Sequence, residues 1–155
     1  MNSNSPILIT GGLGFIGQAI AARFLGQGRA VRILDNVSNA SVEPDTARDA
    51  GAELHIGDVR DMDACAAAVD GVGAVIHLAA QTGVLPSVEA PVDDLAINAG
   101  GTLNLLEACR DAAVDRFTLA SSNAVVGLVE PPIHEEMVQK PVSPYGVSKL
   151  AGESY

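Results

Sequence analysis

The chain has 155 residues, a length typical of one domain and sufficient to bury a single hydrophobic core. Hydrophobic residues make up 48% and charged residues 18%, which excludes a disordered or fibrous protein, and no apolar run approaches the roughly 20 residues that span a bilayer, which excludes a membrane protein. Nineteen acidic and nine basic side chains give a formal charge of −10 without a local basic patch, so neither nucleic acid nor anionic lipid is an expected partner.

Cysteine usage and the N-terminal segment indicate the compartment. Residues 1–6 carry no basic region and lead into a short strand-like run, unlike a signal peptide, so a cytoplasmic protein is expected. Cys65 and Cys109 lie in alanine-rich helical stretches without a partner at metal or redox spacing, which favours ordinary buried thiols. The three histidines are scattered as well, and no metal site is expected.

Strands and helices alternate along the chain. Apolar spacing predicts, in chain order, a strand at 6–10, a helix at 15–27, strands at 30–35 and 53–56, a helix at 61–69, a strand at 74–78, a long helix at 88–113, a strand at 116–120 and a helix at 143–155. The polar segment 36–50 has no helical stripe and predicts an irregular loop or a short helix. Because right-handed crossovers cover both faces of such strands, the pattern predicts an α/β fold with a parallel sheet.

A glycine-rich turn follows the first strand directly. It contains G-x-x-G-x-x-G through Gly11, Gly14 and Gly17, and also G-x-G-x-x-G beginning at Gly12. Glycine permits a sharp turn, close approach of backbone N–H groups to a pyrophosphate, and tight packing of helix on strand, while the helix N-terminus stabilises negative charge. Since Asp35 ends the second strand 18 residues after Gly17, the pattern predicts dinucleotide binding.

Asp35 decides the expected cofactor. Its carboxylate would accept hydrogen bonds from the adenosine ribose and repel the extra phosphate of NADP, so NAD is expected. Arg32 lies three residues earlier, on the opposite face of the strand, and is expected to be a solvated strand charge. The Gly57–Asp58–Val59 turn could bracket an adenine ring, and the small residues 78–80 would let a cofactor lie close to the backbone, whereas His77 is expected to be a satisfied strand-end histidine.

The last part of the chain carries candidate catalytic residues. Ser122 follows the fifth strand, and Tyr145 and Lys149 lie four residues apart, on one face of a helix. A nearby ammonium and an oxidised nicotinamide ring both favour the phenolate form, so Tyr145 could accept a proton near neutral pH. A Tyr-x-x-x-Lys pair is common on protein surfaces, but together with the glycine motif and Asp35 it predicts an enzyme.

With these motifs in this order, the chain resembles the extended short-chain dehydrogenase/reductase family, specifically its NAD-dependent sugar-nucleotide epimerases and dehydratases. The resemblance runs from 6 to 155 and includes the segments 34–39, 57–58, 77–80, 98–102 and 143–149. It implies a Rossmann-type, doubly wound sheet of strand order 3-2-1-4-5, with further strands beyond the end of the chain. Residues 1–155 would then form an NAD-binding domain that is incomplete at its C-terminus and lacks the substrate domain.

The resemblance also implies roles for individual residues. Tyr145 is the base, Lys149 binds the nicotinamide ribose, and Ser122 hydrogen-bonds the reacting sugar oxygen. A sugar hydroxyl is transiently oxidised by NAD, and an epimerase returns the hydride to the other face of the ketone. The implied cofactor site comprises Gly11, Gly14, Phe15, Ile16, Gly17, Asp35, Asn36, Asn39, Asp58, Val59, Leu78, Ala79, Ala80, Asn98, Tyr145 and Lys149.

Several alternatives stay open. Val126 stands where the family often has an aromatic residue, and family members are longer than this chain. Nucleotide-sugar dehydratases, decarboxylases and reductases share every motif above, and a dinucleotide sensor without turnover would keep the same fold; the joint presence of Ser122, Tyr145 and Lys149 favours an enzyme with a nucleotide-sugar substrate. The family tends to form homodimers through two helices, here 88–113 and the one from 143, but the apolar stripes of these helices are equally consistent with core packing.

Overall fold

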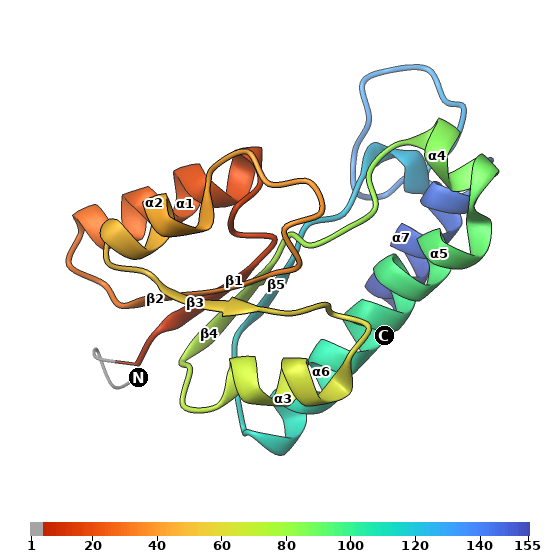
Figure 1. Cartoon of the computed structure of the whole chain (residues 1–155). Coiled ribbons are helices and arrows are strands. Elements are labelled where there is room, and N and C mark those ends of the chain that lie inside the picture. The colour runs from red at the N-terminus through yellow and green to blue at the C-terminus, as the bar shows by residue number, and fades with distance from the viewer. Residues whose placement is uncertain (1–4) are drawn as a thin grey trace.

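Five parallel strands form one sheet in the computed structural model, which describes residues 5–155. Helices cover both faces of the sheet (Figure 1), and the strand order β3-β2-β1-β4-β5 confirms the predicted Rossmann-type topology. Residues 1–4, and with them most of the segment that carries the prediction about a signal peptide, lie outside the described part. The strands are β1 (Ile7–Thr10), β2 (Val31–Asp35), β3 (Glu53–Ile56), β4 (Ala74–His77) and β5 (Phe117–Leu119).

The register of the strands brings their carboxyl ends to a common edge. Thr10, the last residue of β1, pairs with Leu34 of β2 on one side and with His77 of β4 on the other. Asp35 ends β2 opposite Ile56 of β3. The loops that leave the strands therefore meet at one edge of the sheet, which is where ligands bind in open parallel sheets.

The strands are apolar on both faces because helices bury both. On one face, Ile9 and Ile33 pack with side chains of α1 (Phe15–Gly26) and α2 (Pro44–Asp49). On the other face, Leu8 and Leu34 pack with α3 (Met62–Val69) and α6 (Gly101–Asp111). These four strand side chains are essentially fully buried. Burial of an aliphatic side chain of this size contributes about 1.5–3 kcal/mol, so the two layers stabilise the sheet that carries the loops.

The long helix predicted over 88–113 is present without a break only over 91–111, and it includes a π-helical turn that was not predicted. The segment consists of the end of α4 (Val84–Glu89), then α5 (Pro91–Leu95), the π-helical turn η1 (Ala96–Gly100) and α6. Pro91 ends α4 because proline has no N–H for a helix interior, and Ala90 before it leaves the helical region, with φ −134° and ψ 66°. The π-helical turn adds one residue to a turn of helix and thereby shifts the faces of the helix on either side of it.

The other predicted helices agree with the structure to within a few residues. The segment 36–50 contains a loop followed by the short α2, as one of the two alternatives predicted. The last helix, α7 (Pro144–Ser154), begins at a Ser143 N-cap whose Oγ accepts a hydrogen bond from Gly146 N at 3.1 Å. A short 3-10 turn, η2 (Asn123–Val125), precedes it. Within residues 5–155, every helix is too short or too polar to cross a bilayer.

Candidate functional site

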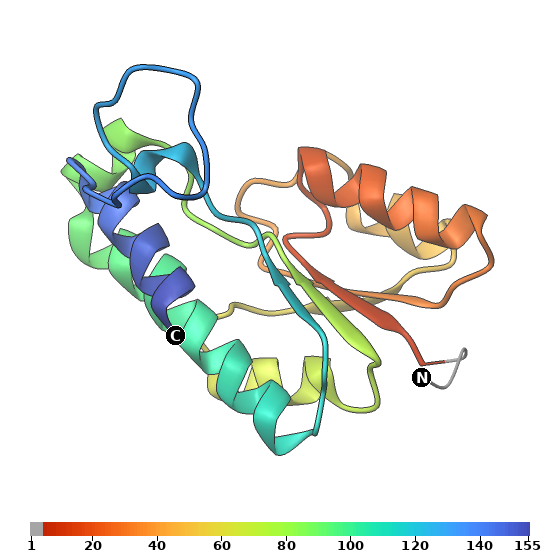
Figure 2. The same cartoon turned by 180° about the vertical axis from the view of Figure 1, so that it is seen from behind.

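A cavity of about 600 Å³ opens at the carboxyl ends of the strands. The loops that follow all five strands contribute to its lining, and Tyr145 and Lys149 of α7 complete it. In Figure 2, α7 (blue) lies beside the green helices α4 and α5, and its residues line the same cavity as the glycine turn after β1. Every predicted cofactor residue except Asn98 lies in this lining.

The glycine turn leaves no room for side chains. Gly11 has φ +66°, and a Cβ there would lie 2.8 Å from Ala79 N. A Cβ on Gly17 would lie 2.3 Å from Gly11 O, because α1 packs directly on the turn. Gly14 is the N-cap of α1 and has no capping side chain, so the first-turn N–H groups of this helix are left for a ligand at the cavity.

Asp35 connects the two loops on which the predicted adenosine site depends. Its Oδ2 accepts a hydrogen bond from Leu13 N at 3.0 Å, within the glycine turn, and its Oδ1 accepts one from Val37 N at 2.8 Å. Each carboxylate oxygen has two acceptor positions, so both retain capacity for a ribose hydroxyl. The residue therefore fixes the turn as well as lining the cavity, a role that the sequence pattern did not indicate.

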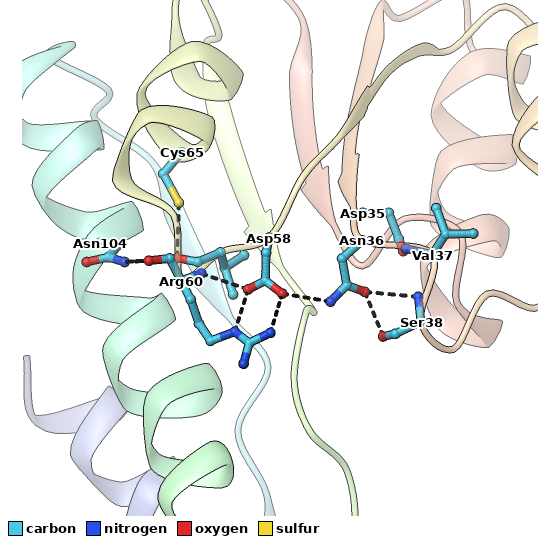
Figure 3. A network of polar contacts seen from close by, with 9 residues as sticks. Asp35, Asn36, Val37, Ser38, Asp58, Arg60, Cys65 and Asn104 are labelled. Carbon is cyan, nitrogen blue, oxygen red and sulfur yellow. Dashed lines mark hydrogen bonds and ion pairs between the residues drawn. The ribbon is translucent and has the colours of Figure 1, made fainter.

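Asp58 lines the cavity and is held by a polar network. Figure 3 shows this network. Arg60 donates to both carboxylate oxygens, from Nε at 2.9 Å and from Nη2 at 2.8 Å, and Asn36 Nδ2 donates to Oδ2 at 2.9 Å. The hydrogen bond from Arg60 holds the pKa of Asp58 well below its ordinary value. Asp58 is thus a fixed acceptor at neutral pH. Sequence reasoning missed Arg60; its place two residues after a strand-end aspartate was the available signal.

Tyr145 and Lys149 both line the cavity from α7. Lys149 is buried, and its Nζ donates to Ala120 O, just beyond β5, at 2.9 Å. Burial lowers the pKa of Lys149, and the negative charge of Asp94 opposes this effect. The helix approaches the loop after β5 closely, since a Cβ on Gly146 would lie 2.5 Å from Ala124 O. The structure therefore places a phenol and a buried amine on one cavity.

Ser122 and Asn98 do not line the cavity. The Oγ of Ser122 caps η2 by accepting a hydrogen bond from Ala124 N at 3.1 Å. The neighbouring Ser121 lines the cavity instead of Ser122, and its Oγ donates to Glu153. Asn98 is buried behind the lining, where its side-chain amide makes hydrogen bonds to both backbone groups of Gln81. The roles assigned to both residues by resemblance remain predictions. Further lining residues that were not predicted, such as Ser38, Ser41 and Thr82, also follow strand ends.

His77 is a satisfied buried histidine, as predicted. Thr10 Oγ1 accepts hydrogen bonds from Leu78 N and Ala79 N, so its own proton is donated to His77 Nδ1 at 2.6 Å. Thr102 Oγ1 donates to Asn98 O, so it accepts from His77 Nε2 at 3.1 Å. These directions require the neutral ring with its proton on Nε2. Burial, with a smaller effect of the Lys149 charge, lowers the pKa of His77 to about 3.

This lowered pKa predicts a pH-dependent stability. Below about pH 6.5 the unfolded chain protonates His77 and the folded chain does not, so folding loses stability as the pH falls from 6.5 toward 3. Between pH 7 and 5 we expect the free energy of unfolding to fall by about 2 kcal/mol from this group alone. Chemical denaturation at several pH values measures it. The variant His77→Gln should lack this slope, and the exposed His134→Gln should keep it; equal slopes in both would contradict the assignment.

Arg32 differs from the expectation of a solvated charge. It does lie on the opposite face of the strand from Asp35, but its guanidinium is mostly buried and donates to Ala68 O at 2.9 Å and Asp70 O at 2.6 Å, at the end of α3. It also pairs with Glu53 of β3 at 2.9 Å. The prediction failed because the free carbonyls at the C-terminus of a helix attract a cation. The sequence around Arg32 does not show that the end of α3 lies beside it, since only the fold brings the two together.

Cys65 and Cys109 are buried free thiols, as predicted. Burial raises the pKa of Cys65 to about 12 and that of Cys109 to about 11, so neither is a reactive thiolate at neutral pH. Cys65 lies on α3 and Cys109 on α6, and both belong to the hydrophobic cluster between these helices and the sheet. Among the described residues, no group of three metal-ligating side chains comes together.

Comparison with known proteins agrees with this geometry. The family model described as the NAD dependent epimerase/dehydratase family matches residues 7–155. The chain belongs to this family. It is 42% identical, over 96% of its length, to a putative UDP-glucose 4-epimerase of Methanocaldococcus jannaschii, of which it covers 49%. It is also 38% identical to an NAD-dependent glucose-6-phosphate dehydrogenase of Haloferax volcanii, with 97% of the chain and 61% of that relative covered.

Solved structures of the epimerase/dehydratase family have the same fold. The UDP-glucose 4-epimerase of Brucella ovis, solved in complex with NAD, superposes with a TM-score of 0.89 at 35% identity over 97% of this chain and 46% of that one. The chain thus spans about half the length of the UDP-glucose 4-epimerases that it matches. The fold and the family are therefore common to these proteins, while the relatives are named for more than one reaction.

Proposed function

We propose that this chain is the NAD-binding and catalytic part of an enzyme that epimerises a nucleotide-sugar. The observation that carries the proposal is that three motifs from distant parts of the sequence line one cavity: the glycine turn, Asp35 and the Tyr145–Lys149 pair. A dinucleotide requires the first two, and removal of a proton from a hydroxyl requires the third. The relatives named UDP-glucose 4-epimerases support a nucleotide-sugar as the substrate.

The residues present suit NAD. The crowded turn at Gly11 and Gly17 excludes side chains where a pyrophosphate would approach the backbone, and the N-terminus of α1 offers free N–H groups to it. This explains how a chain of charge −10 can bind an anion. The carboxylates of Asp35 and Asp58 would hold the adenosine end, and Asp35 would exclude the additional phosphate of NADP.

The proposed chemistry assigns separate tasks to the residues of α7. Tyr145 Oη would accept the proton of a sugar hydroxyl, and later return it when the ketone is reduced. The Lys149 ammonium would favour the phenolate of Tyr145 and hold the nicotinamide ribose. Ser122 would hydrogen-bond the reacting sugar oxygen through its hydroxyl proton, since its Oγ acts as acceptor in the hydrogen bond from Ala124 N. When bound, NAD supplies the acceptor and donor of the hydride.

Two alternatives are weighed against this proposal. A dehydratase, decarboxylase or reductase of the same family would use the same residues, and the dehydrogenase of Haloferax volcanii is a relative with another reaction. A dinucleotide sensor could use the Lys149 amine to hold the cofactor, but it would need no base, and Tyr145 lines the same cavity. The pair of Tyr145 and Lys149 therefore favours an enzyme.

The predicted homodimer is not tested by these observations and stays a prediction. Its two helical regions, 88–113 and the helix from 143, do carry exposed apolar side chains: Val88, Val92, Leu95 and Val147.

Calorimetric titration with NAD and NADP tests the cofactor part of the proposal. We expect NAD to bind at least about tenfold more tightly than NADP, because the Asp35 carboxylate repels a second phosphate on the ribose. The variant Asp35→Ser should lose most of this preference while keeping the fold. Equal binding of both cofactors by the unmodified chain would contradict the assignment of Asp35. Interconversion of UDP-glucose and its 4-epimer by the full-length protein tests the reaction.

A further inference from the structure

Asp94 on α5 is a buried carboxylate that the proposed chemistry does not use. Its side chain is fully buried, with 0% exposure. Its Oδ1 accepts a hydrogen bond from Asn98 Nδ2 at 3.0 Å, whereas its Oδ2 has no hydrogen-bond partner in the described part of the chain. An ionised carboxylate in the interior is costly unless a positive charge compensates it. The charge of Asp94 therefore needs a partner within the same packed region.

The buried cation of that region is Lys149. Helices α5 and α7 pack against each other, and their ribbons lie side by side in both views (Figures 1 and 2). Of the three N–H donors of an ammonium, Lys149 Nζ uses one in its hydrogen bond to Ala120 O. A buried carboxylate and a buried ammonium thus lie on two helices that pack against each other, and no direct ion pair joins them in the described part of the chain. The charge of Asp94 raises the pKa of Lys149, against the larger and opposite effect of burial.

Asp94 also fixes the orientation of a side-chain amide between the two helices. Asn98 Oδ1 accepts a hydrogen bond from Gln81 N, so Nδ2 must point the other way, toward Asp94 Oδ1, Gln81 O and Ser148 Oγ. Ser148 lies next to Lys149 in sequence, and its Oγ donates to Tyr145 O at 3.0 Å. The contacts therefore run from Asp94 through Asn98 and Ser148 to the backbone of the catalytic helix.

The other ionisable groups around Lys149 do not replace Asp94. His77 of β4 is neutral, as its hydrogen bonds require. Tyr145 lies on the same helix and lines the same cavity. Glu153, one turn further along α7, accepts hydrogen bonds from Ser121 and Gln139. Asp94 is thus the acidic group placed to balance the ammonium from inside the protein.

We propose that Asp94 is a positioning residue for the Tyr145–Lys149 pair: it balances the buried ammonium of Lys149 and, through Asn98 and Ser148, anchors the helix that carries both side chains. This inference rests on the proposed function for its catalytic meaning. The charge balance and the anchoring are properties of this chain itself and are measurable without turnover.

The two lysines of the sequence make the direct test simple. Labelling lysine with ¹³C at Cε gives NMR signals for Lys140 and Lys149 only, and their pH titration can be followed separately. In the variant Asp94→Asn, which keeps an oxygen for Asn98 but removes the charge, we expect the titration midpoint of Lys149 to fall by about one pH unit or more. The Lys140 signal is the internal reference. The exposed neighbour Asp93→Asn is the matched control and should leave Lys149 unchanged. An unchanged Lys149 midpoint in Asp94→Asn would overturn the proposal.

A double-mutant cycle covers the case in which Asp94→Asn unfolds too easily for NMR. If the two charges balance each other, Lys149→Met leaves the Asp94 carboxylate uncompensated. This substitution should therefore reduce the folding equilibrium constant at least about tenfold more in the chain with Asp94 than in the Asp94→Asn variant. Additive effects would refute the coupling. Neither measurement depends on epimerase activity, so a confirmed coupling in a protein that turns over no nucleotide-sugar would remove the proposed function alone.

Discussion

Replacing Gly17 with alanine is expected to weaken NAD binding at least about a hundredfold and to destabilise the fold by about 1–3 kcal/mol. The added methyl group would lie 2.3 Å from Gly11 O and 2.6 Å from Gly12 Cα. Both are backbone atoms, so no rotamer change relieves the clash, and the start of α1 must move away from the turn. The pyrophosphate would then lose the helix N-terminus that is proposed to bind it. Calorimetry with NAD and thermal unfolding measure the two effects.

The same helix offers a matched control. Gly26 is the last residue of α1, it is exposed, and a Cβ there meets nothing within 4 Å. Gly26→Ala should therefore leave NAD binding unchanged and stabilise the chain by up to about 1 kcal/mol, because alanine loses less backbone entropy in a helix. If Gly17→Ala behaved like Gly26→Ala, the packing of α1 on the glycine turn would not matter for the cofactor.

Replacing Tyr145 with phenylalanine is expected to lower the turnover of the full-length enzyme by about 10³-fold, the size of effect that general acid–base catalysis contributes. The ring and its packing remain, so NAD affinity should stay within a few-fold of the original. Steady-state kinetics with a nucleotide-sugar and calorimetry with NAD separate the two quantities. Parallel losses of turnover and of NAD binding would show that Tyr145 acts in cofactor binding and not as the base.

Tyr155 provides the control for this change. It is the other tyrosine of the chain, it is largely exposed, and it lies outside the cavity lining. Tyr155→Phe should leave both turnover and NAD binding unaffected. A loss of turnover in both variants would point to a general effect on α7 rather than to the hydroxyl of Tyr145.

Local signals in the sequence were sufficient for most of the fold. The five apolar runs alternate with helices and predict a parallel sheet, and the strand order that the family resemblance implies is the observed one. The long helix predicted over 88–113 began too early because apolar spacing continues through Pro91, although proline in position 91 was a visible stop signal. The π-helical turn after it, which contacts α7, had no signal in the sequence.

The candidate site was predictable where it depends on backbone chemistry. Glycines at 11, 14 and 17 and an acid at the end of β2 are required by the close approach of a dinucleotide, whatever packs around them. Between Ser121 and Ser122 the sequence could not choose the residue that lines the cavity, because one residue of offset beyond a strand reverses the direction of a side chain.

The sequence by itself therefore determined the parallel α/β pattern and the glycine turn, which follow from short-range rules of spacing and turn geometry, and its motifs determined the family by resemblance. The tertiary structure alone decided how charges are placed inside the protein. Arg32 donates to carbonyls at the end of α3, and the carboxylate proposed to balance Lys149 lies 55 residues earlier in the sequence, on a helix packed against α7. The physical reason is that desolvation and Coulomb energy depend on distance and burial in three dimensions, which no spacing along the chain encodes.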